Sequence, residues 1–376
     1  YNIGNIYLFE GKFEKAIAAF KRSIIVNPEN FLAHNNLALA YKSTGNFNDS
    51  LKSYKNALEK NQNYVDGHVN YSTQLLMLEK LEEGFEEYEW RKKSKSFSDY
   101  INYSKLNLKS KVWNGEGLDN KKLFVIAEQG IGDLIQFTRY LYLLQKKYKV
   151  EIILYVKSKK FSHFFDKKKF KIISEGDTIP PHDYHNHLLS LLKVFLRDDN
   201  LFCKPVNFFQ KNKEAEEKWT LKLKKYKGPK IGINSLTSLS AKDIPMKYFM
   251  QLASNFDFNF IFLQKSINKN ELKIISNRKN LIYFPDIDSS DKAFIDSIEI
   301  IKNLDLIITA DTSIAHISAT LGKNTWIPLP FVSDWRWFLD ENSSRWYNNV
   351  ALYRSKKIDN WDTSFQTIEK DLKKFF

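Results

Sequence analysis

A glycine turn that ends on an aspartate follows a predicted buried strand at residues 123–127. Gly130 and Gly132 lie two residues apart, and a helical pattern of apolar residues begins at Leu134, directly after Asp133. This order predicts a helix capped by Asp133 at the carboxyl end of a parallel strand, the edge where open α/β sheets bind ligands. Aspartate is also an ordinary helix cap, so this segment alone leaves a catalytic and a structural interpretation open.

A second helix start, after the predicted strand 304–309, carries three residues that cap helices well. Asp311, Thr312 and Ser313 precede a helical pattern that contains His316. The free N–H groups and partial positive charge of a helix start favour phosphate or diphosphate, and the two hydroxyl groups would add donors. The alternative is that the hydroxyl groups only cap the helix and that His316 is a core residue.

Cationic residues near this second helix start offer further contacts for a phosphorylated ligand. Lys242 follows the first strand of the same predicted α/β unit and would neutralise phosphate charge, unless it is only a solvated loop lysine. Arg336 stands between Trp335 and Trp337, a combination that could hold a base or diphosphate, or could equally pack at an interface.

The composition describes a folded, basic chain. Its 376 residues are 43% hydrophobic and 15% aromatic, which excludes a mainly disordered protein. The net charge of +14 fits nucleic acid, anionic membranes or phosphorylated ligands, but the lysines are scattered and no nucleic-acid motif is present. No apolar run of about 18 residues predicts a membrane span. We therefore expect no nucleic-acid partner and no transmembrane segment, and leave peripheral membrane contact open.

The histidine and cysteine content predicts no metal site. His182, His185 and His187 lie close together, but their spacing matches no standard ligand set. The single cysteine, Cys203, excludes an internal disulfide and favours a reducing compartment. We therefore expect no metal, no cofactor and a cytoplasmic location, with the inner membrane face as the alternative.

The first hundred residues repeat at a spacing of 34 residues. Tyr7, Tyr41 and Leu75 align in this register, and Ala16, Ser50 and Gly84 align as small residues. This period, with small residues where two antiparallel helices touch, is typical of tetratricopeptide repeats. Residues 1–100 therefore predict an all-α array of about three repeats, truncated at its N-terminus, that either binds a protein or peptide or serves as a spacer.

The rest of the chain alternates strands and helices, which predicts parallel sheets. After a linker at 101–120, we expect two Rossmann-like lobes, at 121–228 and 229–350, with the boundary at Gly228-Pro229. The last part, 351–376, should end in a helix. The predicted fold is therefore an α/β pair of lobes with parallel sheets, preceded by the all-α repeat array.

Five motifs carry a resemblance to a known family. They are WNGE at 113–116, AEQGIGDLIQFTRYL at 127–141, LDLIITADTSIAHISATLG at 304–322, DWRWF at 334–338 and RWY at 345–347. Together they resemble bacterial tetratricopeptide-repeat glycosyltransferases, whose catalytic half is similar to the heptosyltransferases of glycosyltransferase family 9. The resemblance covers nearly the whole chain. It implies a GT-B fold, with the nucleotide sugar bound mainly by the second lobe, the acceptor by the first, and no metal requirement.

The resemblance also implies roles for individual residues. Asp133 would be the general base, and the donor diphosphate site would contain Asp311, Thr312, Ser313 and His316, with Lys242 as a further contact. The substrate cleft would include Gln129, Gly130, Gly132, Gln136 and Arg336. One departure is notable, because relatives commonly carry a Trp-Ala-Gly type sequence where this chain has Asn234 and Ser235.

These inferences predict an inverting, metal-independent glycosyltransferase that moves a sugar from a nucleotide diphosphate donor to an acceptor hydroxyl group. The repeats would recruit the acceptor, which is a protein or, alternatively, a saccharide. A base takes the proton from the hydroxyl while the diphosphate leaves with growing negative charge. The alternative is a non-catalytic scaffold, in which the repeats bind a protein partner and the two lobes are degenerate. The altered segment at 234–240 supports this alternative, whereas Asp133, Asp311, Thr312 and His316 count against it.

Overall fold

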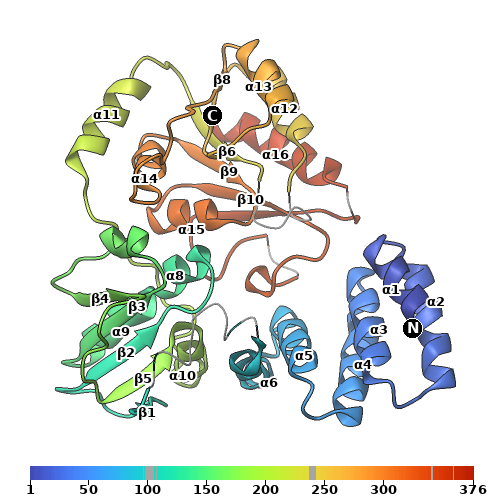
Figure 1. Cartoon of the computed structure of the whole chain (residues 1–376). Coiled ribbons are helices and arrows are strands. Elements are labelled where there is room, and N and C mark those ends of the chain that lie inside the picture. Colours follow the sequence, from blue (N-terminus) through green and yellow to red (C-terminus); the bar gives the residue numbers. More distant parts are fainter. Residues whose placement is uncertain (96, 98–105, 107, 237–242, 340–341, 359) are drawn as a thin grey trace. The chain divides into compact units, whose positions relative to one another are not determined.

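The structure of the chain is a computed structural model, which describes all residues except 96, 98–105, 107, 237–242, 340–341 and 359 (Figure 1). The chain divides into two compact units. The repeat unit comprises Tyr1–Asn107, Leu192–Asp199 and Val332–Glu341, and the two-sheet unit comprises Leu108–Leu191, Asn200–Phe331 and Asn342–Phe376. Each unit is described by itself below.

The repeat unit begins with three pairs of antiparallel helices, drawn in blue to cyan in Figure 1. In each pair, a short turn joins two helices that follow one another in the sequence. They are α1 (Asn2–Phe9) with α2 (Phe13–Val26), α3 (Phe31–Ser43) with α4 (Phe47–Lys60), and α5 (Val65–Met77) with α6 (Leu81–Tyr88). The predicted repeat array is therefore confirmed.

Small residues let the paired helices approach closely, as the 34-residue spacing predicts. Ser50 of α4 is fully buried, and its hydroxyl group donates to the carbonyl of Ala38 in α3 at 2.9 Å. A Cβ on Gly84 of α6 would lie 2.7 Å from Leu76 Cδ2 of α5. The turns also correspond, because Gly11 and Gly45 have positive φ angles and Glu79 adopts the same left-handed conformation in the third pair. The third repeat therefore keeps the backbone geometry of the first two, although it has glutamate where they have glycine.

Two distant segments complete the repeat unit at its third helix pair. The short helix η6 (Trp335–Trp337) places Trp335 edge-on against Phe85 and Tyr88 of α6. Helix α10 (Leu191–Arg197) contributes Lys193 and Arg197, which both form ion pairs with Glu86. The aromatic segment around Trp335 thus packs on the repeats.

The first sheet of the two-sheet unit is parallel throughout, in the order β1-β5-β2-β3-β4. Its central strand β2 (Lys122–Ile126) is apolar at four consecutive buried positions, as expected for a sheet covered on both faces. The other strands are β1 (Lys111–Val112), β3 (Glu151–Val156), β4 (Phe170–Ser174) and β5 (Tyr184–His187). Helices α8 (Ile131–Phe137) and α9 (Arg139–Lys147) follow β2, and η3 (Lys159–Phe164) follows β3.

The second sheet is also parallel, in the order β11-β10-β9-β6-β7-β8. Its strands are β6 (Lys230–Asn234), β7 (Asn259–Phe262), β8 (Leu281–Ile282), β9 (Leu306–Thr309), β10 (Thr325–Leu329) and β11 (Val350–Arg354). Its helices are α11 (Lys213–Leu223), α12 (Met246–Asn255), α13 (Lys269–Ser276), α14 (Ile295–Lys302), α15 (Ser313–Thr320) and α16 (Asp362–Phe375).

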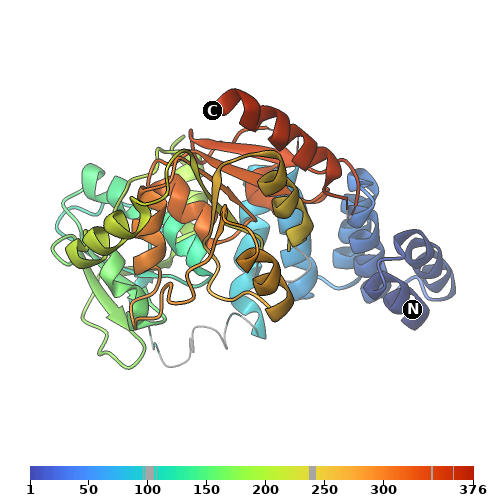
Figure 2. The same ribbon diagram turned by 90° about the horizontal axis from the view of Figure 1, so that it is seen from above.

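The C-terminal helix α16 belongs to the core of this second lobe. Figure 2 shows α16 in red beside the orange strands of the sheet. Its residue Phe365 stacks on Tyr248 of α12 at 4.8 Å between ring centroids, and Ile368 is fully buried in the same apolar cluster. Phe375 packs edge-on against Trp326 of β10. The predicted terminal helix therefore closes one face of the second sheet.

Three strands add to those expected from the sequence. β1 lies inside the segment 101–120 predicted as a linker, and β11 follows the predicted second lobe. β5 contains His185 and His187 of the histidine cluster, and both are buried between neighbouring strands. These strands escaped prediction because β1 has two residues and β5 has polar side chains that find local partners, such as Ser110 Oγ at 2.8 Å from His185 Nδ1.

Candidate functional site

Helix α8 carries the aspartate singled out from the sequence, but it begins earlier than predicted. Gly130 is the N-cap, with its carbonyl accepting from the N–H of Leu134 at 3.1 Å, and Ile131 is the first helical residue. Asp133 therefore lies in the first turn and is not the cap, so that prediction is wrong. Gly130 in extended conformation can cap the helix without a side chain, so the Asp133 carboxylate is not needed as a cap.

The start of α8 lies directly against α15 of the other lobe. A Cβ added to Gly132 would be 2.9 Å from Cδ2 of the His316 imidazole and 3.4 Å from its Nε2. His316 is 4% exposed, and its Nδ1 lies 3.1 Å from the hydroxyl oxygen of Tyr347. The structure thus brings together the predicted base-bearing turn and the predicted donor-side histidine, with a glycine where the two helices touch.

Tyr347 and Arg139 form a buried polar layer behind this contact. Burial raises the pKa of Tyr347, and the charge of Asp133 acts in the same direction, while Arg139 and the Thr320 hydroxyl group oppose it. Tyr347 is therefore a neutral phenol that can hold the His316 ring through Nδ1. The Arg139 guanidinium stacks on the Tyr347 ring at 4.6 Å, which fixes the phenol in turn.

The start of α15 lines a pocket of about 420 Å³ at the carboxyl edge of the second sheet. Thr312 is the N-cap, and its hydroxyl oxygen accepts from the N–H of Ile314 at 3.3 Å. Asn234, at the end of β6, donates from Nδ2 to the same oxygen at 3.2 Å. Asp311 and Ser313 line the pocket beside Thr312, so the structure brings three of the predicted donor-site residues together.

Residues from the neighbouring strand ends complete this pocket. Gln264 and Lys265 follow β7, and Lys160 comes from η3 of the first lobe. Lys265 donates to the carbonyl of Asp288 at 3.2 Å, which holds its ammonium group near the pocket. The pocket is lined by two lysines, Lys160 and Lys265, and by two aspartates, Asp288 and Asp311, so the positive charge that would suit a phosphorylated ligand is local to the helix start and the lysines.

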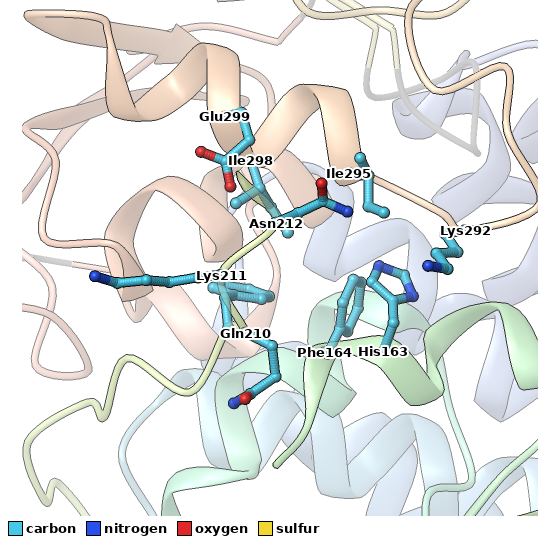
Figure 3. Close-up of a pocket in the computed structure, with 10 residues that line it drawn as sticks. His163, Phe164, Gln210, Lys211, Asn212, Lys292, Ile295, Ile298 and Glu299 are labelled. Carbon is cyan, nitrogen blue, oxygen red and sulfur yellow. The ribbon is translucent and has the colours of Figure 1, made fainter. Parts of the chain in front are cut away.

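A second, smaller pocket of about 200 Å³ lies where the chain crosses from the first lobe to the second (Figure 3). It is lined by His163 of η3, by the crossover residues Gln210 and Asn212, and by Lys292 and Glu299 from the α14 region. Burial lowers the pKa of His163, and the nearby charge of Lys292 acts in the same direction, whereas its backbone hydrogen bonds oppose this. The imidazole is therefore neutral at pH 7, and none of the predicted site residues that the structure describes lies in this pocket.

The remaining predicted residues have different surroundings. Gln136 of α8 is fully buried, and its amide atoms have no hydrogen-bond partner among the described residues. Gln129 is partly exposed beside the α8 start. Arg336 belongs to the repeat unit, where it pairs with Asp334 at 2.8 Å and stacks on Trp335. Lys242 lies outside the described residues.

Several residues of the site gave no sequence signal of their own. Arg139 and Tyr347 act through contacts between segments that are far apart in the chain, which periodicity does not reveal. Asn234 and Gln264 follow parallel strands, so the strand ends could have marked them. Glu128 is 2% exposed, and its carboxylate accepts from the N–H groups of Leu188 and Leu189, which gives it a structural role.

The contact between Gly132 and His316 leads to a first prediction. Gly132→Ala should lower the rate of any reaction that uses groups on both helices about 100-fold, because the added methyl group forces α8 and α15 apart and misplaces groups on both. Gly117→Ala is the control, since a Cβ there meets no atom within 4 Å. Initial rates and thermal unfolding of both variants test this. Equal rates for the two folded variants would show that this contact has no part in catalysis.

Metal-ligand clusters and membrane-spanning helices are both absent from the part of the chain that the structure describes. Outside the undescribed positions, no group of three or more His, Cys, Asp and Glu residues could hold a metal ion. Within the same described part of the chain, every helix is too short or too polar to cross a bilayer.

Two parallel α/β sheets, with a pocket at the carboxyl edge of the second, define a GT-B-like fold that follows a helical repeat array. A solved structure supports this class, the glycosyl transferase family 9 protein from Veillonella parvula DSM 2008. It has a TM-score of 0.53 and 12% identity, and the match covers 70% of this chain and 99% of that chain. This likeness shows the fold.

Family models then identify the two parts of the chain. Residues 4–45 match a TPR repeat model and residues 32–64 a tetratricopeptide repeat model, while residues 140–326 match glycosyltransferase family 9 (heptosyltransferase). The chain therefore combines tetratricopeptide repeats with a heptosyltransferase-like domain of glycosyltransferase family 9. This domain supports glycosyl transfer as the general activity, and the repeats support protein interaction. Asp133 precedes the matched range, whereas Asp311, Thr312 and His316 lie inside it.

Curated relatives match over a short stretch. The E3 ubiquitin-protein ligases TTC3 of Mus musculus and Rattus norvegicus are each 33% identical to this chain over 87 residues. The match covers 23% of this chain, and the chain spans only 4% of the length of either relative. The ligase activity in their name is therefore not carried over to this chain.

Proposed function

We propose that the two-sheet unit transfers a sugar from a nucleotide diphosphate donor to an acceptor hydroxyl group, with inversion and without a metal ion. One observation carries the proposal. Within a family 9 domain, the α15 start that lines the 420 Å³ pocket belongs to the same short helix whose His316 touches the α8 start. A donor and an attacking hydroxyl group could therefore meet across this one helix.

The donor side would stabilise the leaving diphosphate. The positive end of the α15 helix dipole lies at this pocket, and the Thr312 and Ser313 hydroxyl groups add donors. Lys160 and Lys265 contribute positive charge at the same pocket. Fixed donors and charges of this kind stabilise negative charge that grows on the diphosphate as the bond to the sugar breaks.

Asp133 would act as the general base on the acceptor side. Its carboxylate takes the proton of the acceptor hydroxyl group as the oxygen attacks the anomeric carbon, and the bond from that carbon to the diphosphate breaks. The carboxylate stands in the first turn of α8, one residue after the glycine that touches His316. Closure of the two lobes would exclude water during this step.

The repeats would recruit the acceptor, and a protein hydroxyl group is the preferred one. Paired helices bury one face and leave another for a partner, so a protein can bind without entering the pocket. A saccharide acceptor is the alternative. We place the protein in the cytoplasm, with peripheral contact at the inner membrane face as a second location, because its charge of +14 favours anionic surfaces.

Release of nucleoside diphosphate tests the transfer itself. The purified chain is incubated with UDP-, GDP- and ADP-sugars and a lysate of acceptor proteins, and the released nucleotide is quantified. Release from one donor, with a matching mass increase on intact proteins, supports the proposal. No release from any donor supports the alternative of a scaffold with degenerate lobes. If glycans in the lysate gain mass while proteins do not, the acceptor is a saccharide and not a protein.

A further inference from the structure

Gln264 is a buried amide at the donor pocket that the sequence analysis did not single out. It lies two residues after the last residue of β7 and is 5% exposed. Its Oε1 accepts two hydrogen bonds from Ser235, one from the backbone N–H and one from the hydroxyl group, each at 3.0 Å. The side chain is therefore held from one side by the residue that follows β6.

These two bonds fix which way the amide points. The N–H of Ser235 can only donate, so the atom facing it must be the oxygen, and the amide nitrogen must face the other way. That nitrogen, Nε2, is buried and has no hydrogen-bond partner among the described residues. A buried donor without a partner is costly, so such a group commonly awaits a ligand or a water molecule.

The position of Gln264 in the sheet indicates which part of a donor it faces. It lines the same pocket as Asp311, Thr312 and Ser313. Strand β7 is two steps from β9, because β6 lies between them, and each step spans about 4.8 Å. Gln264 therefore lies about 10 Å along the sheet edge from the α15 start. A diphosphate at the α15 start would place its nucleoside, and not its phosphates, near Gln264.

We propose that Gln264 Nε2 donates a hydrogen bond to an oxygen atom of the donor nucleoside, either a ribose hydroxyl group or a base carbonyl group. This inference rests on the proposed function, because it takes a nucleotide as the occupant of the pocket. Gln264 is thus a residue that recognises the nucleoside, held in place by Ser235. Adenine has no carbonyl group, whereas uracil, cytosine and guanine have one, so the two acceptors can be told apart.

Calorimetric titration with UDP, GDP, CDP and ADP tests the proposal on the full chain and on two variants. Gln264→Met keeps the size but removes the amide group, and we expect binding about 10-fold weaker, the usual worth of one buried hydrogen bond. Gln264→Glu keeps an acceptor for Ser235 but replaces the donor, and we expect about 100-fold weaker binding. Gln251→Glu on α12 is the charge-matched control, because Gln251 is exposed.

The outcomes separate the contact from the donor site itself. Equal loss for all nucleotides supports a ribose contact, and loss confined to UDP, GDP and CDP supports a base carbonyl contact. Unchanged binding to Gln264→Met overturns the inference and leaves the donor site standing. A loss that grows from UMP to UDP assigns the contact to phosphate and also overturns it. If no nucleotide binds the unaltered chain, the proposed function fails first.

Discussion

Replacement of Asp133 by asparagine should lower kcat for sugar transfer about 1,000-fold, within the range that general bases contribute. Asparagine has the same shape but cannot take a proton from the acceptor hydroxyl group. Asp133 is partly exposed in the first turn of α8, so the fold should be unchanged. Binding of the donor nucleotide should stay within about twofold, because the donor groups lie on α15. Initial rates and titration calorimetry measure the two quantities.

Asp257→Asn is the control for this substitution, since Asp257 is exposed and lies after α12, away from both helix starts. It should keep the full rate. A scaffold would instead retain its cellular role in the Asp133→Asn variant, and an enzyme that uses another base would retain its kcat. Either result, with the variant folded, would remove Asp133 from the mechanism.

The second large effect concerns stability. Arg139→Met should lower the free energy of unfolding of the two-sheet unit by about 3–5 kcal/mol, the usual cost of breaking a buried charged contact. The guanidinium is 2% exposed and donates to the carbonyls of Gln136 at 2.6 Å, Trp346 at 2.5 Å and Cys203 at 3.1 Å. Methionine fills part of the space but leaves these three carbonyl groups without their donor.

Urea unfolding followed by tryptophan fluorescence measures this loss, and Arg22→Met supplies the matched control. Arg22 is exposed on α2, so its replacement should change stability by less than about 0.5 kcal/mol. A loss below about 1 kcal/mol for Arg139→Met would show that water or neighbouring side chains replace the guanidinium, and that the layer behind His316 is not held by it.

The repeats and most parallel strands could be predicted because their residues obey local periods. The 34-residue spacing placed small residues where α3 and α4 touch, and Ser50 confirms that placement. Strands such as β2 and β9 are short apolar runs, since helices cover both faces of a parallel sheet. The start of α15 was also predictable, because Thr312 caps it through its own side chain.

The helix start at α8 shows where local patterns fail. A glycine N-cap has no side chain to mark it, so the sequence pattern points to Asp133 as the cap although the helix begins at Ile131. Strand β5 could not be predicted for a related reason. Its residues are polar and are buried through specific hydrogen bonds, which a pattern of alternating apolar and polar residues does not reveal. Asn186, for example, donates to the carbonyl of Trp113 on the neighbouring segment.

The contacts that position the candidate site could not be predicted because they join distant parts of the chain. His316 meets Gly132 from the other lobe, and Tyr347 lies behind it on a segment that follows β10. The orientation of the Gln264 amide depends on its hydrogen bond from Ser235, which lies at the end of the neighbouring strand. Each of these residues is visible in the sequence, but which of them come into contact depends on the order of the strands in the sheet.

Calorimetric titration of UDP, GDP, ADP and CMP into the full chain, and into Ser313→Glu, tests the central claim most directly. A glutamate in the first turn of α15 stabilises the helix, so Ser313→Glu should fold while its charge repels a diphosphate. We predict that one nucleotide binds the unaltered chain most tightly, that Ser313→Glu loses this binding, and that the midpoint temperature of its thermal unfolding is not lowered. Failure of every nucleotide to bind, or equal binding by Ser313→Glu, would contradict a nucleotide-sugar site at α15.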